Sequence, residues 1–161
     1  PEVLALVPEG EKYDFSKQLF PRVLEMGWPM YARQIDGIWF DVGNPDQLLD
    51  AQSVLINKMD SLPFTRPQGE LTNGCIVHPN AIVEGTFRNS SIDSDCRLGK
   101  GTNLMDSLLM QGVQIGQNSI IKNSVIGRNV TIGDNVKIMH CVIGDEVVID
   151  SNQEYNGKKI P

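Results

Sequence analysis

The sequence offers few side chains whose types and spacing could do chemistry, and Asp41 is the first to consider. It stands in Trp39-Phe40-Asp41-Val42-Gly43, where a carboxylate would lie at the end of a predicted strand and the glycine would leave room for a ligand. A carboxylate in such a setting can hold a divalent metal ion. A lone aspartate is weak evidence, because the same residue could be a turn or helix-capping acid just ahead of Asn44.

Two further features suggest chemistry but favour a structural interpretation. Residues 98–103, Leu-Gly-Lys-Gly-Thr-Asn, superficially look like a phosphate-binding loop, but they lack the glycine spacing that such a loop requires. The three cysteines, Cys75, Cys96 and Cys141, are an odd number with no close pair. This argues against a disulfide framework and a zinc site, and it fits a reducing cytoplasm.

A 17-residue repeat organises the second half of the chain. Large aliphatic residues recur there with spacings of 6, 6 and 5, at Ile92, Leu98, Leu104, Leu109, Ile115, Ile121, Ile126, Ile132, Ile138, Ile143 and Ile149. From Leu98 onward, the residue two positions earlier is small or β-branched: Cys96, Thr102, Ser107, Val113, Ser119, Ser124, Val130, Val136, Cys141 and Val147. Residues that tolerate left-handed backbone angles follow at Gly101, Asn118, Asn129 and Asn135.

This pattern predicts a mainly β protein built as a parallel β-helix. Each short strand buries one large aliphatic residue, each corner has room only for a small one, and stacked coils align the aliphatics into a column. We expect roughly four coils between Cys75 and Ile149, with Ile76, Ile82 and Phe87 as the first inward residues. Residues 151–161 lack this register and are expected to cap the open end.

The first half of the chain predicts a small α/β segment. Val3–Val7 has the composition of a buried strand. Asp14 can cap a helix that Pro21 interrupts and Gly27 ends. Residues 30–42 predict a hairpin that turns at Asp36-Gly37.

A second helix is predicted after the hairpin. Asn44 as N-cap and Pro45 in the first turn begin it, and apolar positions continue to Met59. The residues that follow are rich in proline and glycine and predict a linker. A segment as short as 1–62 is marginal as an independent fold and needs a partner for its apolar strands.

Three stretches carry a resemblance to a known family: VPEGEKYDFSKQLFPRVLEMG, GIWFDVGNPDQLLDAQ and VEGTFRNSSIDSDCRLGKGTNLMDSLLMQGVQIG. They resemble the C-terminal portion of the sugar-1-phosphate nucleotidylyltransferases, or nucleotide-sugar pyrophosphorylases, of the glucose-1-phosphate adenylyltransferase and mannose-1-phosphate guanylyltransferase branch. The resemblance implies that residues 1–62 end an incomplete nucleotidyltransferase domain, residues 63–74 link, and residues 75–161 form a left-handed β-helix with a C-terminal cap. The left hand is taken from the resemblance.

The resemblance also implies a role for Asp41. In this family the Asp of the Trp-x-Asp-x-Gly motif is one of two carboxylates that hold Mg²⁺ between the nucleotide and the sugar phosphate. The family's Gly-rich nucleotide loop, its second magnesium-binding Asp and its sugar-phosphate Lys have no counterpart here. The expected partners are therefore the missing N-terminal half, with nucleotide and sugar 1-phosphate bound in the complete enzyme, and this piece is expected to be inactive alone.

Two alternatives remain open at this stage. One is a hexapeptide-repeat acyltransferase, since these enzymes use a histidine as general base and His140 lies within a coil, although a surface role is favoured for both His140 and His78. The other is a non-catalytic assembly or regulatory subunit. Either way a homo-oligomer is expected. The net charge of −6 argues against nucleic acid, and no apolar run is long enough for a membrane span.

Overall fold

The computed structural model describes residues 2–61, 69–72 and 74–161. The chain divides into two compact units, one ending at Trp39 and the other running from Phe40 to Pro161. No helix among the described residues is both long enough and apolar enough to cross a membrane.

The first unit is helical. It contains a 3₁₀ helix (Glu2–Leu6), a π-helical turn (Phe15–Leu19) and the α-helix α1 (Phe20–Glu25). The predicted helix between Asp14 and Gly27 is confirmed. The Lys17 N–H donates to the Asp14 carboxylate at 2.9 Å, and Gly27, with a φ of 68°, ends the helix in the left-handed region.

A strand and a hairpin predicted in the first half are absent from the described structure. Val3–Val7, predicted as a buried strand, falls largely in the 3₁₀ helix, where Leu4 is 58% exposed. The hairpin predicted at 30–42 is also wrong, since those residues form neither helix nor strand. A short apolar run does not distinguish strand from helix, and an isolated two-stranded hairpin is at best marginally stable without a surface to pack on.

The second predicted helix is confirmed as α2 (Pro45–Lys58), which a short 3₁₀ turn (Met59–Ser61) extends. The Asn44 side chain accepts from the Gln47 N–H at 2.9 Å and caps the helix. The apolar residues that α2 buries are Ala51 and Ile56, with Met59 just beyond its end.

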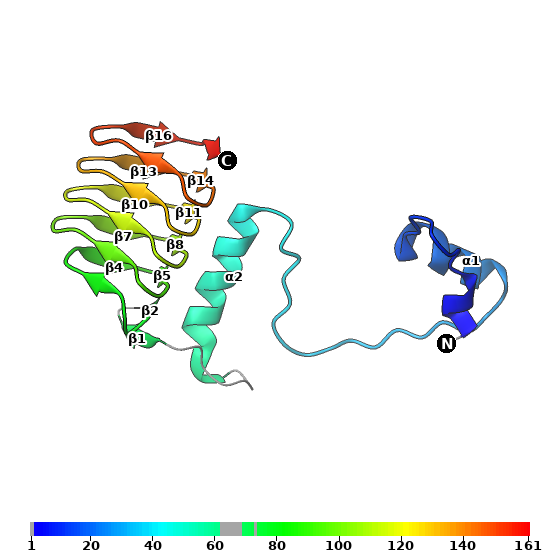
Figure 1. Ribbon diagram of the computed structural model, residues 1–161. Helices are drawn as coiled ribbons and strands as arrows, with labels where there is room; N and C mark the ends of the chain where they lie inside the picture. The colour runs from blue at the N-terminus through cyan, green and yellow to red at the C-terminus, as the bar shows by residue number, and fades with distance from the viewer. Residues whose placement is uncertain (1, 62–68, 73) are drawn as a thin grey trace. The chain divides into compact units, whose positions relative to one another are not determined.

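A parallel β-solenoid of about five turns forms the rest of the second unit, as Figure 1 shows. Its three faces are sheets A, B and C. The strands of sheet A are β1 (Glu70–Thr72), β2 (Cys75–Val77), β5 (Ser91–Ile92), β8 (Leu108–Leu109), β11 (Val125–Ile126), β14 (Val142–Ile143) and β17 (Lys159–Ile160). Those of sheet B are β3 (Ile82–Val83), β6 (Arg97–Leu98), β9 (Gln114–Ile115), β12 (Thr131–Ile132) and β15 (Val148–Ile149). Those of sheet C are β4 (Thr86–Arg88), β7 (Asn103–Met105), β10 (Ile120–Lys122), β13 (Lys137–Met139) and β16 (Glu154–Asn156).

The predicted column is confirmed in both register and burial. Leu98 pairs with Ile115, and Ile132 pairs with Ile149, each 17 residues on. All eleven aliphatic positions from Ile92 to Ile149 are at most 4% exposed. Neighbouring turns therefore stack equivalent side chains on one another, which no single turn could bury alone.

Both ends of the solenoid correct the prediction. In the first turn the inward residues are Val77 and Val83, which align with Ile92 and Leu98, whereas Ile82 points outward and is 46% exposed. This turn is two residues shorter than the repeat, so the predicted inward residues Ile76 and Ile82 each lie one position before the observed ones, whereas Phe87 aligns with Leu104 as expected.

The last turn is also part of the solenoid. Residues 151–161 do not form an irregular cap, because β16 and β17 continue sheets C and A. Tyr155 aligns with Ile138, and Ile160 aligns with Ile143, so they extend the column to about five turns where four were expected.

The predicted linker 63–74 is described only in part, since residues 62–68 and 73 lie outside the described residues. Within it, β1 pairs antiparallel with β2 and aligns Leu71 with Ile76. The domain boundaries at 62 and 75 stay predictions.

Candidate functional site

Asp41 lies on an exposed stretch just before α2. The Gly43 N–H donates to the Asp41 carbonyl at 3.0 Å and to the Gln47 side chain at 2.9 Å. Gln47 belongs to the first turn of α2, so the helix cap fixes the backbone two residues after Asp41. The side chain of Asp41 is exposed. The structure therefore places a solvent-exposed carboxylate next to a backbone segment that the first turn of α2 holds in position.

A metal ion would find one ligand here and would need others. Within the described residues no three His, Cys, Asp or Glu side chains are grouped so as to hold an ion. An aspartate oxygen is the hard ligand that Mg²⁺ prefers, and Mg²⁺ commonly takes only one or two protein carboxylates together with substrate phosphates. Asp41 fits the part of one such ligand, and its metal-binding role stays a prediction.

Helix α2 packs against the solenoid and links it to the Asp41 segment. The Gln52 side-chain nitrogen donates to the Ser107 carbonyl at 3.2 Å, joining the middle of α2 to a corner between sheets C and A. Val125, an outward residue of sheet A, is only 6% exposed, whereas the outward Val148 of sheet B is 71% exposed. Figure 1 shows α2 running alongside sheet A. Asp41, α2 and the solenoid therefore belong to one compact unit.

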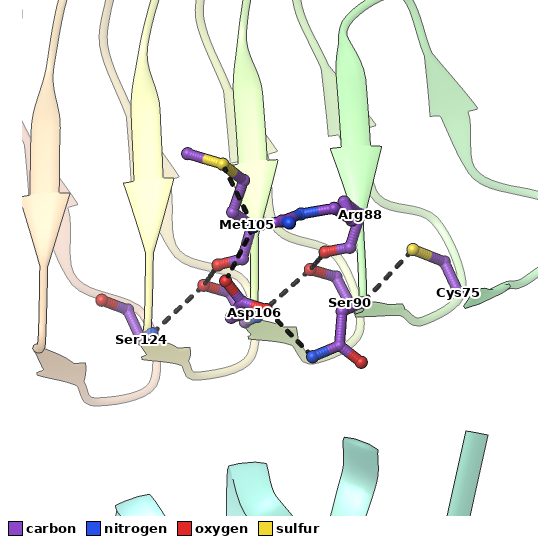
Figure 2. Close-up of polar contacts among 8 residues, drawn as sticks. Cys75, Arg88, Ser90, Met105, Asp106 and Ser124 are labelled. Atoms are coloured by element: carbon purple, nitrogen blue, oxygen red, sulfur yellow. Dashed lines mark hydrogen bonds and ion pairs between the residues drawn. The ribbon is translucent and has the colours of Figure 1, made fainter. Parts of the chain in front are cut away.

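The corner that receives Gln52 is built from a ladder of buried hydroxyls, shown in Figure 2. The Ser107 N–H donates to Ser90 Oγ at 3.1 Å, and the Ser124 N–H donates to Ser107 Oγ at the same distance. Each hydroxyl donates in turn to the carbonyl two residues before it, for Ser107 at 2.6 Å to Met105. Cys75 accepts from the Ser90 N–H at 3.2 Å and takes the equivalent position in the first turn.

Within the described residues, no hydrogen bond or ion pair joins either histidine side chain to a carboxylate or a nucleophile. His140 is an exposed corner residue with a φ of 52°, and its N–H donates to the Lys122 carbonyl at 3.0 Å. Nδ1 of His78 accepts from the Asn80 N–H at 3.2 Å, which places the ring proton of the neutral form on Nε2. Both positions agree with the structural interpretation that the sequence favoured.

The glycine segment and the cysteines are also structural. Gly99 and Gly101 lie at a regular corner of the repeat, where the Thr102 N–H donates to the Gly99 carbonyl at 3.2 Å. All three cysteines are buried. Burial raises the pKa of Cys96 to about 11 and also raises the pKa of Cys75, so both are thiols rather than reactive thiolates at neutral pH.

The small corner residues were predictable from the sequence, but the hydrogen bonds between the serines and the bond from Gln52 to Ser107 were not predicted. Ser107 and Ser124 were recognised as small, and the 17-residue spacing that also includes Ser90 was the available signal for a ladder. No signal in the sequence pointed to Gln52, because its partner is 55 residues away.

The solenoid matches a known protein family. Residues 69–160 match the profile described as the GMPPB C-terminal domain. Among curated proteins, a glucose-1-phosphate adenylyltransferase of Clostridioides difficile is 32% identical over 123 residues, which cover 66% of this chain and 32% of the relative. A UTP–glucose-1-phosphate uridylyltransferase of Synechocystis is 29% identical over 113 residues, covering 70% of this chain and 28% of the relative. The chain thus spans about three tenths of the length of these relatives.

Solved structures with similar coils include the acetyltransferase domain of PglB from Neisseria gonorrhoeae, at 12% identity and a TM-score of 0.41. That match covers 71% of this chain and 70% of the other. Serine acetyltransferase isoform 3 from Entamoeba histolytica matches at 14% identity and a TM-score of 0.38, over 95% of this chain and 54% of the other. Similarity at this level carries no information about activity.

Proposed function

Because the chain belongs to the GMPPB C-terminal domain family, we propose that it is the C-terminal part of a sugar-1-phosphate nucleotidylyltransferase. The complete enzyme would convert a nucleoside triphosphate and a sugar 1-phosphate into a nucleotide sugar and pyrophosphate. The observation that carries the proposal is the order of parts along the chain: the Trp-Phe-Asp-Val-Gly motif with Asp41, then the capped helix α2 and the matching solenoid, with Asp41, α2 and the solenoid in one compact unit.

The reaction needs little covalent help from the protein. An oxygen of the sugar phosphate attacks the α-phosphorus of the nucleotide, the new P–O bond forms, and pyrophosphate leaves with the electrons of the broken bond. Bound Mg²⁺ would neutralise charge on both phosphates and align them. Asp41 would supply one carboxylate ligand, and Gly43, which has no side chain, would leave room beside it.

The described residues include one carboxylate that suits the site, so the proposal assigns the nucleotide loop and the remaining ligands to a part of the enzyme outside this chain. This chain by itself is then inactive. Exposed apolar residues of the first unit support the existence of that further part, because Tyr31 is 94% exposed and Ile35 is 76% exposed. Large apolar side chains in such numbers suit contact with a further part of the protein.

The test is pyrophosphate release by the complete protein from each nucleoside triphosphate with glucose 1-phosphate or mannose 1-phosphate. We expect Asp41→Asn to lower kcat by two orders of magnitude or more, since it removes a ligand charge that acts on the reacting phosphates. Asp46→Asn is the matched control, because Asp46 is an exposed acid in the first turn of α2. Near-normal turnover of the Asp41 variant would reject the assignment of Asp41.

We also propose that the solenoid holds copies of the enzyme together. Sheet A is partly covered by α2, whereas the outward row of sheet B has Ile82 and Val148 at its two ends, 46% and 71% exposed, with Arg97, Gln114 and Thr131 between them. A second copy of the chain is the occupant we propose for sheet B. The solution mass of the complete protein tests this: Val148→Lys should shift it toward the monomer, and the same mass in the variant would exclude this face.

A further inference from the structure

Helix α2 joins the Asp41 segment to the solenoid, and a hydrogen bond from its middle crosses to a corner of the solenoid. Helix α2 starts four residues after Asp41 and is fixed there by the Gly43 and Asn44 contacts with Gln47. Seven residues further on, Gln52 donates to the Ser107 carbonyl across 55 residues of sequence. The helix therefore connects a candidate metal ligand at one end with the solenoid at its middle.

Ser107 is a rigid anchor for this contact. Its carbonyl accepts from the Ser91 N–H at 3.1 Å as well as from Gln52. Its N–H and its hydroxyl are both used in the hydroxyl ladder, with Ser90 Oγ and the Met105 carbonyl as partners. Ser107 is completely buried, and Figure 2 shows the ladder of this corner with the helix below it. A group held by so many bonds cannot shift without disturbing neighbouring turns.

A glutamine at position 52 is less favourable for packing than an apolar residue would be. Its side-chain oxygen Oε1 is buried and has no hydrogen-bond partner among the described residues. An unpaired buried amide oxygen destabilises a protein, whereas Met or Leu at this place would pack on the apolar face of sheet A without that cost. A polar group buried in an otherwise apolar contact can determine where a helix packs while adding little to the stability of the protein.

We propose that Gln52 is a positioning residue, which together with the Ser107 carbonyl sets where α2 holds Asp41. This rests on the proposed nucleotidyl transfer. The eight residues from Pro45 to Gln52 form a rigid helical segment about 10 Å long, since an α-helix rises about 1.5 Å per residue. Without the Gln52 bond α2 can tilt, and a tilt displaces Asp41 in proportion to this length. A misplacement of 1 Å in an active site can lower a rate about 100-fold. The solenoid thereby acts as a fixed base for the metal-binding segment.

The experiment compares three variants of the complete enzyme. Gln52→Met removes the donor and the unpaired oxygen but keeps the length of the side chain. Gln52→Lys keeps a donor within reach of the Ser107 carbonyl. Asn57→Ala is the control on the same helix, because the Asn57 side chain is exposed and bonds only within α2, to the Ser53 carbonyl at 2.8 Å.

Two kinetic quantities decide the outcome: kcat and the Mg²⁺ concentration that gives half the maximal rate. For Gln52→Met we expect kcat to fall about 10-fold or more and the Mg²⁺ requirement to rise, with a melting temperature that is unchanged or higher. Gln52→Lys should recover most of both, and Asn57→Ala should match the wild type. Equal kinetics in Gln52→Met and Asn57→Ala would overturn the proposal.

Hydrogen exchange of the α2 amides separates this proposal from the proposed function. If the wild-type enzyme releases no pyrophosphate from any nucleoside triphosphate with any sugar 1-phosphate, nucleotidyl transfer is rejected, and exchange still reports on the helix anchor. Faster exchange at Ala51 in Gln52→Met, but not in Asn57→Ala, supports an anchor at Gln52. Unchanged exchange in both variants rejects the anchor whatever the reaction is.

Discussion

The solenoid and residues 2–39 use large apolar side chains in opposite ways. In the solenoid, eleven aliphatic residues from Ile92 to Ile149 are at most 4% exposed. In the first unit only Leu19 and Val23 are buried, while Leu24, Tyr31 and Ile35 are 61%, 94% and 76% exposed. The difference lies in where the packing partner comes from. Each turn of the solenoid is covered by the next turn of the same repeat, whereas the first unit has too few described elements to cover its own apolar surface.

Local sequence therefore predicts which side chains are buried only where the packing partner is an adjacent repeat of the same pattern. The solenoid satisfies its polar groups in the same way, through carbonyls and hydroxyls that recur every 17 residues.

Removing one member of the column should cost most. We expect Ile132→Ala to lower the free energy of unfolding by about 2–5 kcal/mol, because the stacked turns above and below cannot collapse into the space. Leu24→Ala in the first unit, where the side chain is 61% exposed, should change it by no more than about 0.5 kcal/mol. Denaturant titration of both variants measures the two values, and similar losses would erase the contrast between the regions.

The buried hydroxyl ladder should matter next. Ser107→Ala leaves the buried Ser124 N–H without its acceptor, which should cost about 1–3 kcal/mol. Ser151→Ala removes an acceptor of the Asp134 N–H at an exposed corner, where water can replace it, so a much smaller loss is expected. Thermal melts of the two variants supply the comparison. The ladder is dispensable if Ser107→Ala melts at the wild-type temperature.

The cap of α2 should contribute less. Asn44→Ala removes the acceptor of the Gln47 N–H and should cost about 1 kcal/mol. The loss should appear as faster hydrogen exchange in the first turn of α2, with the solenoid unaffected. In the wild type we expect the amides of the solenoid core to exchange more slowly than those of α2. Equal exchange rates in the two would contradict a difference in stability between solenoid and helix.

The smallest effect concerns pH. Burial raises the pKa of Cys96 to about 11 from 9.0, so the folded protein retains a proton that the unfolded chain releases above pH 9. Stability from this group is therefore complete below pH 9 and falls as the pH rises toward 11. Cys96→Val, which uses the residue type of the equivalent corners at Val113 and Val130, should be less sensitive between pH 8.5 and 10.5. Identical pH dependence in the two proteins would show that Cys96 titrates as in the unfolded chain.

Most of the solenoid was predictable because its rule is local and repeated. The spacing of Leu98, Ile115 and Ile132 predicted both the strands and their register. The ends were less predictable because the rule changes there: the first turn is shorter, and Tyr155 occupies the place of an aliphatic residue. The N-terminal strands at Val3–Val7 and 30–42 failed for another reason, since a strand depends on a neighbour that the local sequence does not reveal.

For the candidate site, the sequence predicted one residue, Asp41, but not the contacts that hold its segment in place. The motif around Asp41 marked a possible metal ligand, and the prediction of Asn44 as an N-cap was confirmed. The bond from Gln52 to Ser107 was not foreseeable, because neither residue type nor spacing distinguishes Gln52 from an ordinary exposed glutamine.

The sequence by itself determined the β-solenoid, its inward column and the helix before it, since hydrophobic period, corner residues and caps are written in neighbouring positions. Only the tertiary structure decided that sheet A receives α2, that buried serines connect successive turns, and that one glutamine joins helix to solenoid. Those contacts depend on which distant groups approach within hydrogen-bond distance. That proximity arises when the turns stack, and no stretch of local sequence encodes it.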